Sequence, residues 1–361
     1  MRRAFVLATA LSAVACSARD PGRTGDRTHA YDPAATLAET SSRTPTPFSS
    51  RDPARGEPGQ ARLTAHFYDV GQGLAVLVDL PRGEHVLVDT GDRKDRPGCG
   101  PSCSAADQHL IARLREDLRG APIDLLWITH PHSDHLGGAE EVLATFPVRA
   151  FVDNGRDPRR AEVARVRRAA RDRGAVMAVI EPGHTQLPMA SPPGISLTAI
   201  VPSRWPSSCA RDANECSIGL RIDFGASSVL FTGDAEHDEE GALDPGGPVT
   251  LLQVGHHGSD TSTGPAFLAR VRPRYAVVSA GEPDEGLNRE YCHPRALVVR
   301  RLTRVLGGPS SSTLQAFDGD RCDRAQPSDW VSVATSDALW ATERDGDVVL
   351  TTTGDGAFHR R

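Results

Sequence analysis

Four potential metal ligands stand within six residues of one another in the stretch IDLLWITHPHSDHLGG, residues 123–138. They are His130, His132, Asp134 and His135. The apolar segment before them, residues 123–128, has the length and composition of a buried strand. Side chains two positions apart in an extended chain project to the same face, so the first two histidines can bind one ion. The other two ligands lie on the turn beyond, where they can reach a second ion. The spacing favours a metal centre over a polar loop without metal.

Two later segments offer further ligands at the ends of predicted strands. Residues 229–231 lead into Asp234, and residues 251–254 lead into His256 and His257. A lone carboxylate after a strand often caps a helix. With four ligands upstream, we expect Asp234 instead to bridge two cations, because a shared carboxylate reduces their repulsion at the ~3.5–4 Å separation of two-metal sites.

Five further motifs accompany the HxHxDH spacing and carry a resemblance to a known family. They are DVGQG at 69–73, VDTG at 88–91, TGD at 232–234, GHHGS at 255–259 and HP at 293–294. Together they resemble the metallo-β-lactamase superfamily and, within it, the hydrolase domain at the C-terminal end of ComEC-type DNA-uptake channels. The resemblance covers residues 62–308. It implies an α/β (α+β) fold, the αββα sandwich of two packed mixed sheets flanked by helices.

The resemblance also implies a ligand set for two divalent ions, Zn²⁺ or Mn²⁺. Similar motifs assign the ions to six residues, namely His130, His132, Asp134, His135, Asp234 and His256. They make His257 a general acid or an oxyanion contact, with Asp134 as the second catalytic candidate. Asp89 would orient ligands from beneath the site. Asp69 and Asp89 each end a predicted strand, at an edge where a site could form, and capping of a helix or turn is the alternative for both. His293 could close the site from the other side, and a position at a helix N-terminus is its alternative.

A third histidine for the first ion is the open question. The superfamily usually has one between HxHxDH and TGD, and this sequence offers His184 in EPGHTQ or, in its place, Asn214 in NECSIGL. His184 precedes a predicted strand at 195–201, so it falls one hairpin too early. Asn214 fits the ComEC-type pattern and leaves the first ion one protein ligand short.

The N-terminal residues predict export. Residues 1–16 combine two arginines, an apolar run and Cys16, which make a secretory signal too short to span a bilayer. Cys16 stands at the position of a lipoprotein cysteine, although Ala13-Val14-Ala15 also fits an A-x-A cleavage site. We expect an extracytoplasmic protein, held at the cell envelope by an N-terminal lipid anchor or otherwise periplasmic or secreted.

The composition then divides the chain into a linker and one domain. Residues 17–60 are rich in Ser, Thr, Pro, Gly, Arg and Asp and predict a flexible, disordered linker. The hydrolase-like domain should span 61–361 and open with a meander of short strands. After residue 306 we expect a loop insertion and then a final hairpin around Asp345-Gly346.

Six cysteines besides Cys16 predict three disulfides in an exported protein. Fifteen connectivities are possible. Proximity in the sequence favours Cys99 with Cys103 and Cys209 with Cys216, which leaves Cys292 for Cys322. A zinc cluster is the alternative, but the paired CxxC spacing is missing.

The net charge and the predicted ligands together limit which functions are possible. Residues 1–60 hold eight Arg and six Asp plus Glu, so residues 61–361 carry a formal charge of about −8. That excludes a strongly basic footprint for nucleic acid, but not a nuclease whose metal ions supply local positive charge. The predicted basic helix at 157–173 is either a solvated face or a contact for phosphates.

The expected chemistry is metal-assisted hydrolysis, in which divalent ions lower the pKa of a bound water toward ~7. Phosphodiesters, DNA first, are the leading substrate class because of the resemblance. Hydrolysis of a small or cell-wall ester, lactone or lactam is the second hypothesis. A tethered binding module with an incomplete first site is the third. No protein partner is implied.

Overall fold

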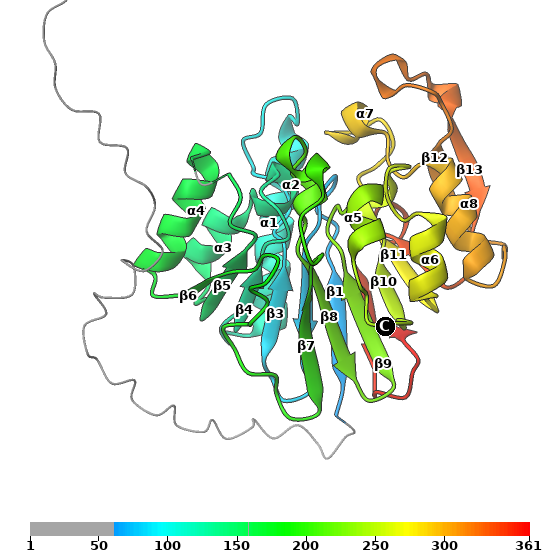
Figure 1. The fold of residues 1–361 in the computed structure, drawn as a ribbon. Helices are drawn as coiled ribbons and strands as arrows, with labels where there is room; N and C mark the ends of the chain where they lie inside the picture. Colours follow the sequence, from blue (N-terminus) through cyan, green and yellow to red (C-terminus); the bar gives the residue numbers. More distant parts are fainter. Residues whose placement is uncertain (1–60, 158) are drawn as a thin grey trace, which may run out of the picture. The chain divides into compact units, whose positions relative to one another are not determined.

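The computed structural model describes residues 61–157 and 159–361, which Figure 1 draws in colour. The predicted signal sequence, the lipoprotein Cys16 and the linker at 17–60 lie outside the described residues. Within the described part of the chain, no helix has both the length and the apolar character needed to cross a membrane.

Eight strands form the first sheet, in the order β16-β15-β1-β2-β3-β4-β5-β6. Their bounds are β1 Leu63–Phe67, β2 Val76–Asp79, β3 His85–Val88, β4 Leu125–Trp127, β5 Ala150–Asp153, β6 Val176–Val179, β15 Val348–Thr352 and β16 His359–Arg360. Strands β1 to β3 form the expected antiparallel meander, and β3 to β6 run parallel. Because β15 pairs with β1, the end of the domain closes onto its first strand.

Six strands form the second sheet, in the order β14-β11-β10-β9-β8-β7. Their bounds are β7 Ile195–Ile200, β8 Gly219–Phe224, β9 Ser227–Phe231, β10 Leu251–Gln253, β11 Tyr275–Val278 and β14 Leu339–Ala341. The first three strands are antiparallel, and β9, β10, β11 and β14 are parallel. Both sheets are therefore mixed, as expected.

Two predictions for the C-terminal part are wrong. The expected loop insertion contains β12 (Thr313–Phe317) and the following segment β13 (Trp330–Ala334), which pair as a separate antiparallel sheet. The expected final hairpin does not form, because β14 pairs with β11 in the second sheet and β15 with β1 in the first. A short helix, α9 (Thr342–Asp345), connects them. An apolar run shows that a strand is buried without showing which strand it pairs with.

Helices cover the outer face of each sheet, as Figure 1 shows. Over the first sheet lie α1 (Pro101–Leu118), α3 (Ala139–Thr145) and α4 (Ala161–Asp172); over the second lie α5 (His237–Ala242), α6 (Pro265–Val271) and α8 (Ala296–Val305). The faces between the sheets share one apolar core, to which β4 gives Leu125 and Trp127. Leu126 faces the helices instead. Strand β4 is thus buried on both faces, which explains its unbroken apolar sequence.

Candidate metal centre

Strand ends from both sheets meet at the candidate metal centre. Asp89 follows β3, and the HxHxDH motif follows its parallel neighbour β4, with α2 (Ser133–Leu136) beginning inside the motif. Asp234 follows β9, and His256 and His257 follow the parallel strand β10. The carboxyl ends of parallel neighbours lie at the same edge of a sheet, where ligand sites of such folds commonly form. The topology therefore brings these segments together.

Four buried side chains form the centre of the cluster, and we call them the group of four. They are Asp134, His135, Asp234 and His257, and one ligand atom from each lies within 4.8 Å of all the others. The Oδ2 atom of Asp234 is 3.1 Å from Nε2 of His135 and 3.5 Å from Nε2 of His257. Donor atoms of nitrogen and carboxylate oxygen at this spacing suit one divalent ion.

Hydrogen bonds at Nδ1 fix both histidines of this group. The Nδ1 of His135 lies 2.7 Å from Oδ2 of Asp89, and the Nδ1 of His257 lies 2.7 Å from the Ser279 carbonyl oxygen. Asp89 is itself held by the backbone N–H and the hydroxyl of Thr129. With Nδ1 donating, each ring presents Nε2 to the centre, the arrangement typical of metal-binding histidines.

Four further side chains lie beside the group of four, and we call them the flanking set. They are His130, His132, Asn214 and His256. The Nε2 atoms of His130 and His256 are 4.0 and 3.7 Å from Oδ2 of Asp234. The rings of His130 and His132 lie 4.7 Å apart, so the two alternate residues of the motif do share one side. Asp234 therefore faces two sets of histidines, as a bridging carboxylate must.

Unpaired buried atoms in the described structure fit a bound cation. Nε2 of His130, Oδ1 of Asp234 and Oδ1 of Asn214 are buried without a hydrogen-bond partner. A buried polar atom without a partner costs about 1–3 kcal/mol. A divalent ion would satisfy these lone pairs, and an oxygen and nitrogen donor set fits Zn²⁺ or Mn²⁺.

The electrostatics differ between the histidines of the cluster. Burial, with the neighbouring imidazoles, lowers the pKa of His130 well below its usual range, so its ring is neutral. Burial opposes ionisation of Asp134 and Asp234, but the adjacent histidines hold the pKa of both carboxyls below the usual range. Burial opposes protonation of His135 and His257, but the nearby carboxylates outweigh it and raise the pKa of His135 well above its usual range and that of His257 to about 9. A cation bound to these two rings would therefore displace a proton from each.

Two features of the backbone make this close convergence possible. Asp89, His256 and His257 adopt positive φ values of 56°, 48° and 54°, and strain of this kind persists where the surrounding structure imposes it. Gly137 and Gly138 were expected to permit a tight turn, yet both have helical dihedrals. They are needed instead because the backbone of residues 90–93 passes close by. A Cβ on Gly137 would lie 2.2 Å from the Arg93 backbone nitrogen, and a Cβ on Gly138 would lie 2.3 Å from the Thr90 carbonyl oxygen.

The structure brings all six predicted ligands to one place, together with His257. It places His257 rather than His256 in the group of four, although the sequence had suggested the opposite roles. His184 is 78% exposed in a hairpin and pairs only with Glu181, whereas Asn214 lies in the cluster. His293 stands at its edge, with its ring 5.3 Å from that of His256.

A cavity of about 590 Å³ opens over the cluster and contains residues that the sequence did not single out. Three arginines, Arg93, Arg96 and Arg160, line it together with Tyr291. Arg96 donates to Asp92 and to the Tyr291 hydroxyl, and Arg160 donates to the carbonyl of Pro131. Only Arg160 carried a sequence signal, as part of the predicted basic helix; the others reach the cavity through tertiary structure.

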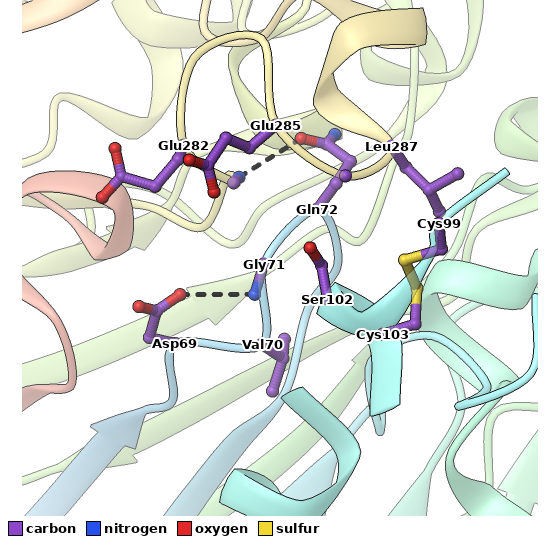
Figure 2. A pocket seen from close by; sticks show the side chains of 12 residues that line it. Asp69, Val70, Gly71, Gln72, Cys99, Ser102, Cys103, Glu282, Glu285 and Leu287 are labelled. Carbon is purple, nitrogen blue, oxygen red and sulfur yellow. Dashed lines mark hydrogen bonds between the residues drawn. A yellow bond between two sulfur atoms is a disulfide. The ribbon is translucent and has the colours of Figure 1, made fainter. Parts of the chain in front are cut away.

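A second pocket, of about 90 Å³, lies on the other side of Gln72 and is acidic (Figure 2). Asp69, Glu282 and Glu285 line it. Gln72 separates the two regions, since its amide contacts Nδ1 of His293 and accepts from the Gly281 N–H. Asp69, one of the two aspartates expected at a strand end near a site, therefore belongs to this pocket and not to the metal centre.

The three predicted disulfides are all present. They join Cys99 to Cys103, Cys209 to Cys216 and Cys292 to Cys322. Two of them lie beside the cavity over the metal centre, because Asn214 and Tyr291 on the same segments line that cavity, whereas Cys99 and Cys103 line the small acidic pocket. The disulfides thus stabilise the loops around the site, and they indicate an extracytoplasmic location.

Comparisons with known proteins agree with this geometry. Recombination protein 2 of Haemophilus influenzae is 32% identical over 214 residues, which cover 59% of this chain and 24% of that protein. ComE operon protein 3 of Bacillus subtilis is 29% identical over 277 residues, which cover 68% of this chain and 32% of that protein. The chain thus spans a quarter to a third of the curated relatives that it matches, and it is a distant homologue of these ComEC-like competence proteins.

A solved structure and a family model extend the comparison. The diiron β-hydroxylase CmlA of Streptomyces venezuelae is 16% identical, with a TM-score of 0.40 over 70% of this chain and 53% of that one. The model of the metallo-beta-lactamase superfamily matches residues 68–282, more than half of the chain. The αββα architecture and the family expected from the motifs are confirmed, and the chain belongs to the metallo-β-lactamase superfamily.

Proposed function

We propose that the protein is a metal-dependent phosphodiesterase, with DNA as its first candidate substrate. The observation that carries the proposal is the set of three arginines around the cavity over the metal centre. These cations stand out because residues 61–361 are acidic overall, with a formal charge of about −8. Guanidinium groups suit phosphate oxygens in geometry and charge.

The chain's own residues would prepare the site for hydrolysis. Two divalent ions, when bound, would activate water and stabilise negative charge at phosphorus. Asp234 would keep the ions at a fixed separation, and the buried Asp89 would hold His135 in orientation through Nδ1. In this proposal His257 and Asp134 contribute as ligands of the group of four, since Nδ1 of His257 is occupied by the Ser279 carbonyl oxygen.

Arg160 offers the sharpest test. It lines the cavity just before α4 and lies 3.6 Å from Glu162, which lines the cavity too. Arg165, inside α4, pairs with Glu140 and does not line this cavity. We expect Arg160→Gln to raise KM for single-stranded DNA and bis(p-nitrophenyl) phosphate about tenfold, equivalent to roughly 1.4 kcal/mol. Arg165→Gln should leave KM unchanged.

The assay would use protein loaded with Mn²⁺ or Zn²⁺, with p-nitrophenyl acetate as a neutral ester for comparison. Cleavage of the neutral ester alone, with no effect of Arg160→Gln, would replace the proposal with hydrolysis of esters, lactones or lactams. Two bound ions with no turnover of either class would favour a binding module.

We propose further that the protein acts outside the cytoplasm, tethered through a lipid on Cys16. The three disulfides support the location. The tether is tested by expression of a Cys16→Ser variant, which should move from the membrane fraction to the soluble fraction. An unchanged distribution would remove the anchor from the proposal.

A further inference from the structure

His256 is aimed at the bridging carboxylate from outside the group of four. Its Nε2 lies 3.7 Å from Oδ2 of Asp234, and the Nε2 of His130 lies 4.0 Å from the same oxygen. Two donor atoms that each lie about 2.0–2.2 Å from one ion are no more than about 4.4 Å apart. Each of the two histidines is therefore within reach of an ion that Asp234 binds.

Contacts at Nδ1 of His256 leave the lone pair on Nε2, where it accepts a long contact of 3.4 Å from the Asn214 amide that a cation could displace. Nδ1 lies 3.1 Å from Oε1 of Glu236 and 3.3 Å from the hydroxyl of Thr261, which itself donates to Glu236. With Nδ1–H directed at a carboxylate, Nε2 carries the lone pair. The Asp89–His135 pair in the group of four has the same construction.

His130 is prepared in a similar way. The Thr129 hydroxyl donates to Oδ2 of Asp89, so it accepts from Nδ1 of His130 at 3.1 Å. Nε2 of His130 is then a buried lone pair with no protein partner. His132 lies beside His130, and it lines the same cavity as His256 and Asn214.

Asn214 stands next to His256 and does not replace it. Its Nδ2 is 3.4 Å from Nε2 of His256 and 3.4 Å from Oε1 of Glu236. Oδ1 of Asn214 is buried without a partner. The amide thus lies beside the position of an ion that His256 also faces, and the short side chain leaves room for the imidazole.

We infer that His256 supplies the third nitrogen ligand of the ion held by the flanking set, together with His130 and His132, with Asp234 shared between the two ions. This assignment rests on the proposed metal-dependent function and deepens it. The first ion is not short of a ligand, because a histidine from the segment after β10 stands in for the one expected between HxHxDH and TGD. The adjacent residues His256 and His257 then serve different ions, which gives their paired positive φ values a purpose.

Metal content tests the assignment independently of turnover. The protein would be dialysed against Mn²⁺ or Zn²⁺, its metal measured by mass spectrometry, and affinities obtained by competition with a chromophoric chelator. His256→Asn suits the test because asparagine tolerates positive φ, which His256 adopts, and is too short to reach the ion. We expect two ions in the original protein and one in the variant. His257→Asn, the matched control, should lose the other ion, and His184→Ala should lose neither.

A double variant keeps the test decisive if His256→Asn folds poorly. Asn214→His combined with His256→Asn moves the imidazole to the neighbouring position, and we expect it to recover the second ion. If His256→Asn bound two ions with unchanged affinity, the inference would be overturned and His256 would be a substrate contact instead. An original protein that binds a single ion would overturn it as well. Two ions in the original protein without phosphodiester cleavage would instead overturn the proposed function and leave this ligand assignment standing.

Discussion

Two carboxylate–imidazole pairs hold histidines toward Asp234, and they differ in how they are buried. In the first, Asp89 and His135 are both fully buried, and their atoms lie 2.7 Å apart. In the second, Glu236 and His256 are 18% and 16% exposed, and their atoms lie 3.1 Å apart. Burial raises the pKa of Asp89, whereas hydrogen bonds from His256 and Thr261 outweigh partial burial and lower the pKa of Glu236.

The difference follows from the elements that carry each pair. Asp89 directly follows β3, and His135 lies in the short helix α2 beyond the neighbouring strand β4, where both side chains are fully enclosed. Glu236 and His256 come from loops after β9 and β10, beside Asn214 in the short 3-10 helix Asn214–Cys216. We call the group of four, which the buried pair supports, the buried half of the centre, and the flanking set, which the partly exposed pair supports, the exposed half. We expect tight binding in the buried half and adjustable binding in the exposed half.

The largest expected effect is the loss of the residue that both halves share. Asp234→Asn keeps the shape of the side chain but removes its charge, so both ions should bind more than about 100-fold more weakly, beyond the 10–100-fold typical of supporting residues. Chelator competition measures both affinities. If only one of the two ions bound more weakly, Asp234 would be a ligand of that ion alone and the two halves would not share it.

A smaller effect is expected when the buried pair is broken. Asp89→Asn should weaken the ion of the group of four about 10–100-fold and leave the ion of the flanking set within about twofold. Its carboxylate accepts two hydrogen bonds from Thr129 besides the one to His135, so a lower melting temperature should accompany the loss. An equal weakening of both ions would show that the halves are not separable.

Local sequence was sufficient for the residues that follow the buried strands. The apolar run before His130, the alternation of His130 and His132, and the aspartate after β9 each depend on neighbours within a few residues. The fold and the family followed from the same motifs, as the family match confirms. Periodicity and short spacing report the geometry of strands and turns directly.

Tertiary contacts decided what the sequence left open. His256 and His257 are adjacent, so their spacing alone could not show which ring joins the group of four; the backbone, with positive φ at both residues, places His257 there. Arg93, Arg96 and Tyr291 reach the cavity from segments far apart in the chain. The prediction of a C-terminal hairpin failed for the same reason, since the partner of a strand depends on contacts across the whole sheet and not on its neighbours in the sequence.

The exposed half should also depend on the disulfide between Cys209 and Cys216. Cys209→Ser with Cys216→Ser releases the segment that carries Asn214, and it should weaken the ion of the flanking set about fivefold while the ion of the group of four holds its affinity. The closed loop is short, so we expect a stability loss of about 2–3 kcal/mol, measured by urea unfolding. The Cys99→Ser, Cys103→Ser variant is the matched control, since that disulfide lines the small acidic pocket and not the cavity over the metal centre. A loss shared equally by both ions would show that the loop supports the whole centre.

The smallest effect is expected from the exposed pair. Glu236→Gln still accepts a hydrogen bond from Nδ1 of His256 but lacks the charge, and partial exposure to solvent already screens that charge. The ion of the flanking set should weaken only about threefold, below the 10–100-fold expected of a buried supporting residue. Compared with Asp89→Asn in the same titration, this variant isolates burial, because both substitutions exchange a carboxylate for an amide at a histidine Nδ1. A loss as large as that of Asp89→Asn would mean that charge and not burial sets the strength of these pairs, and the contrast between the two halves would lose its physical basis.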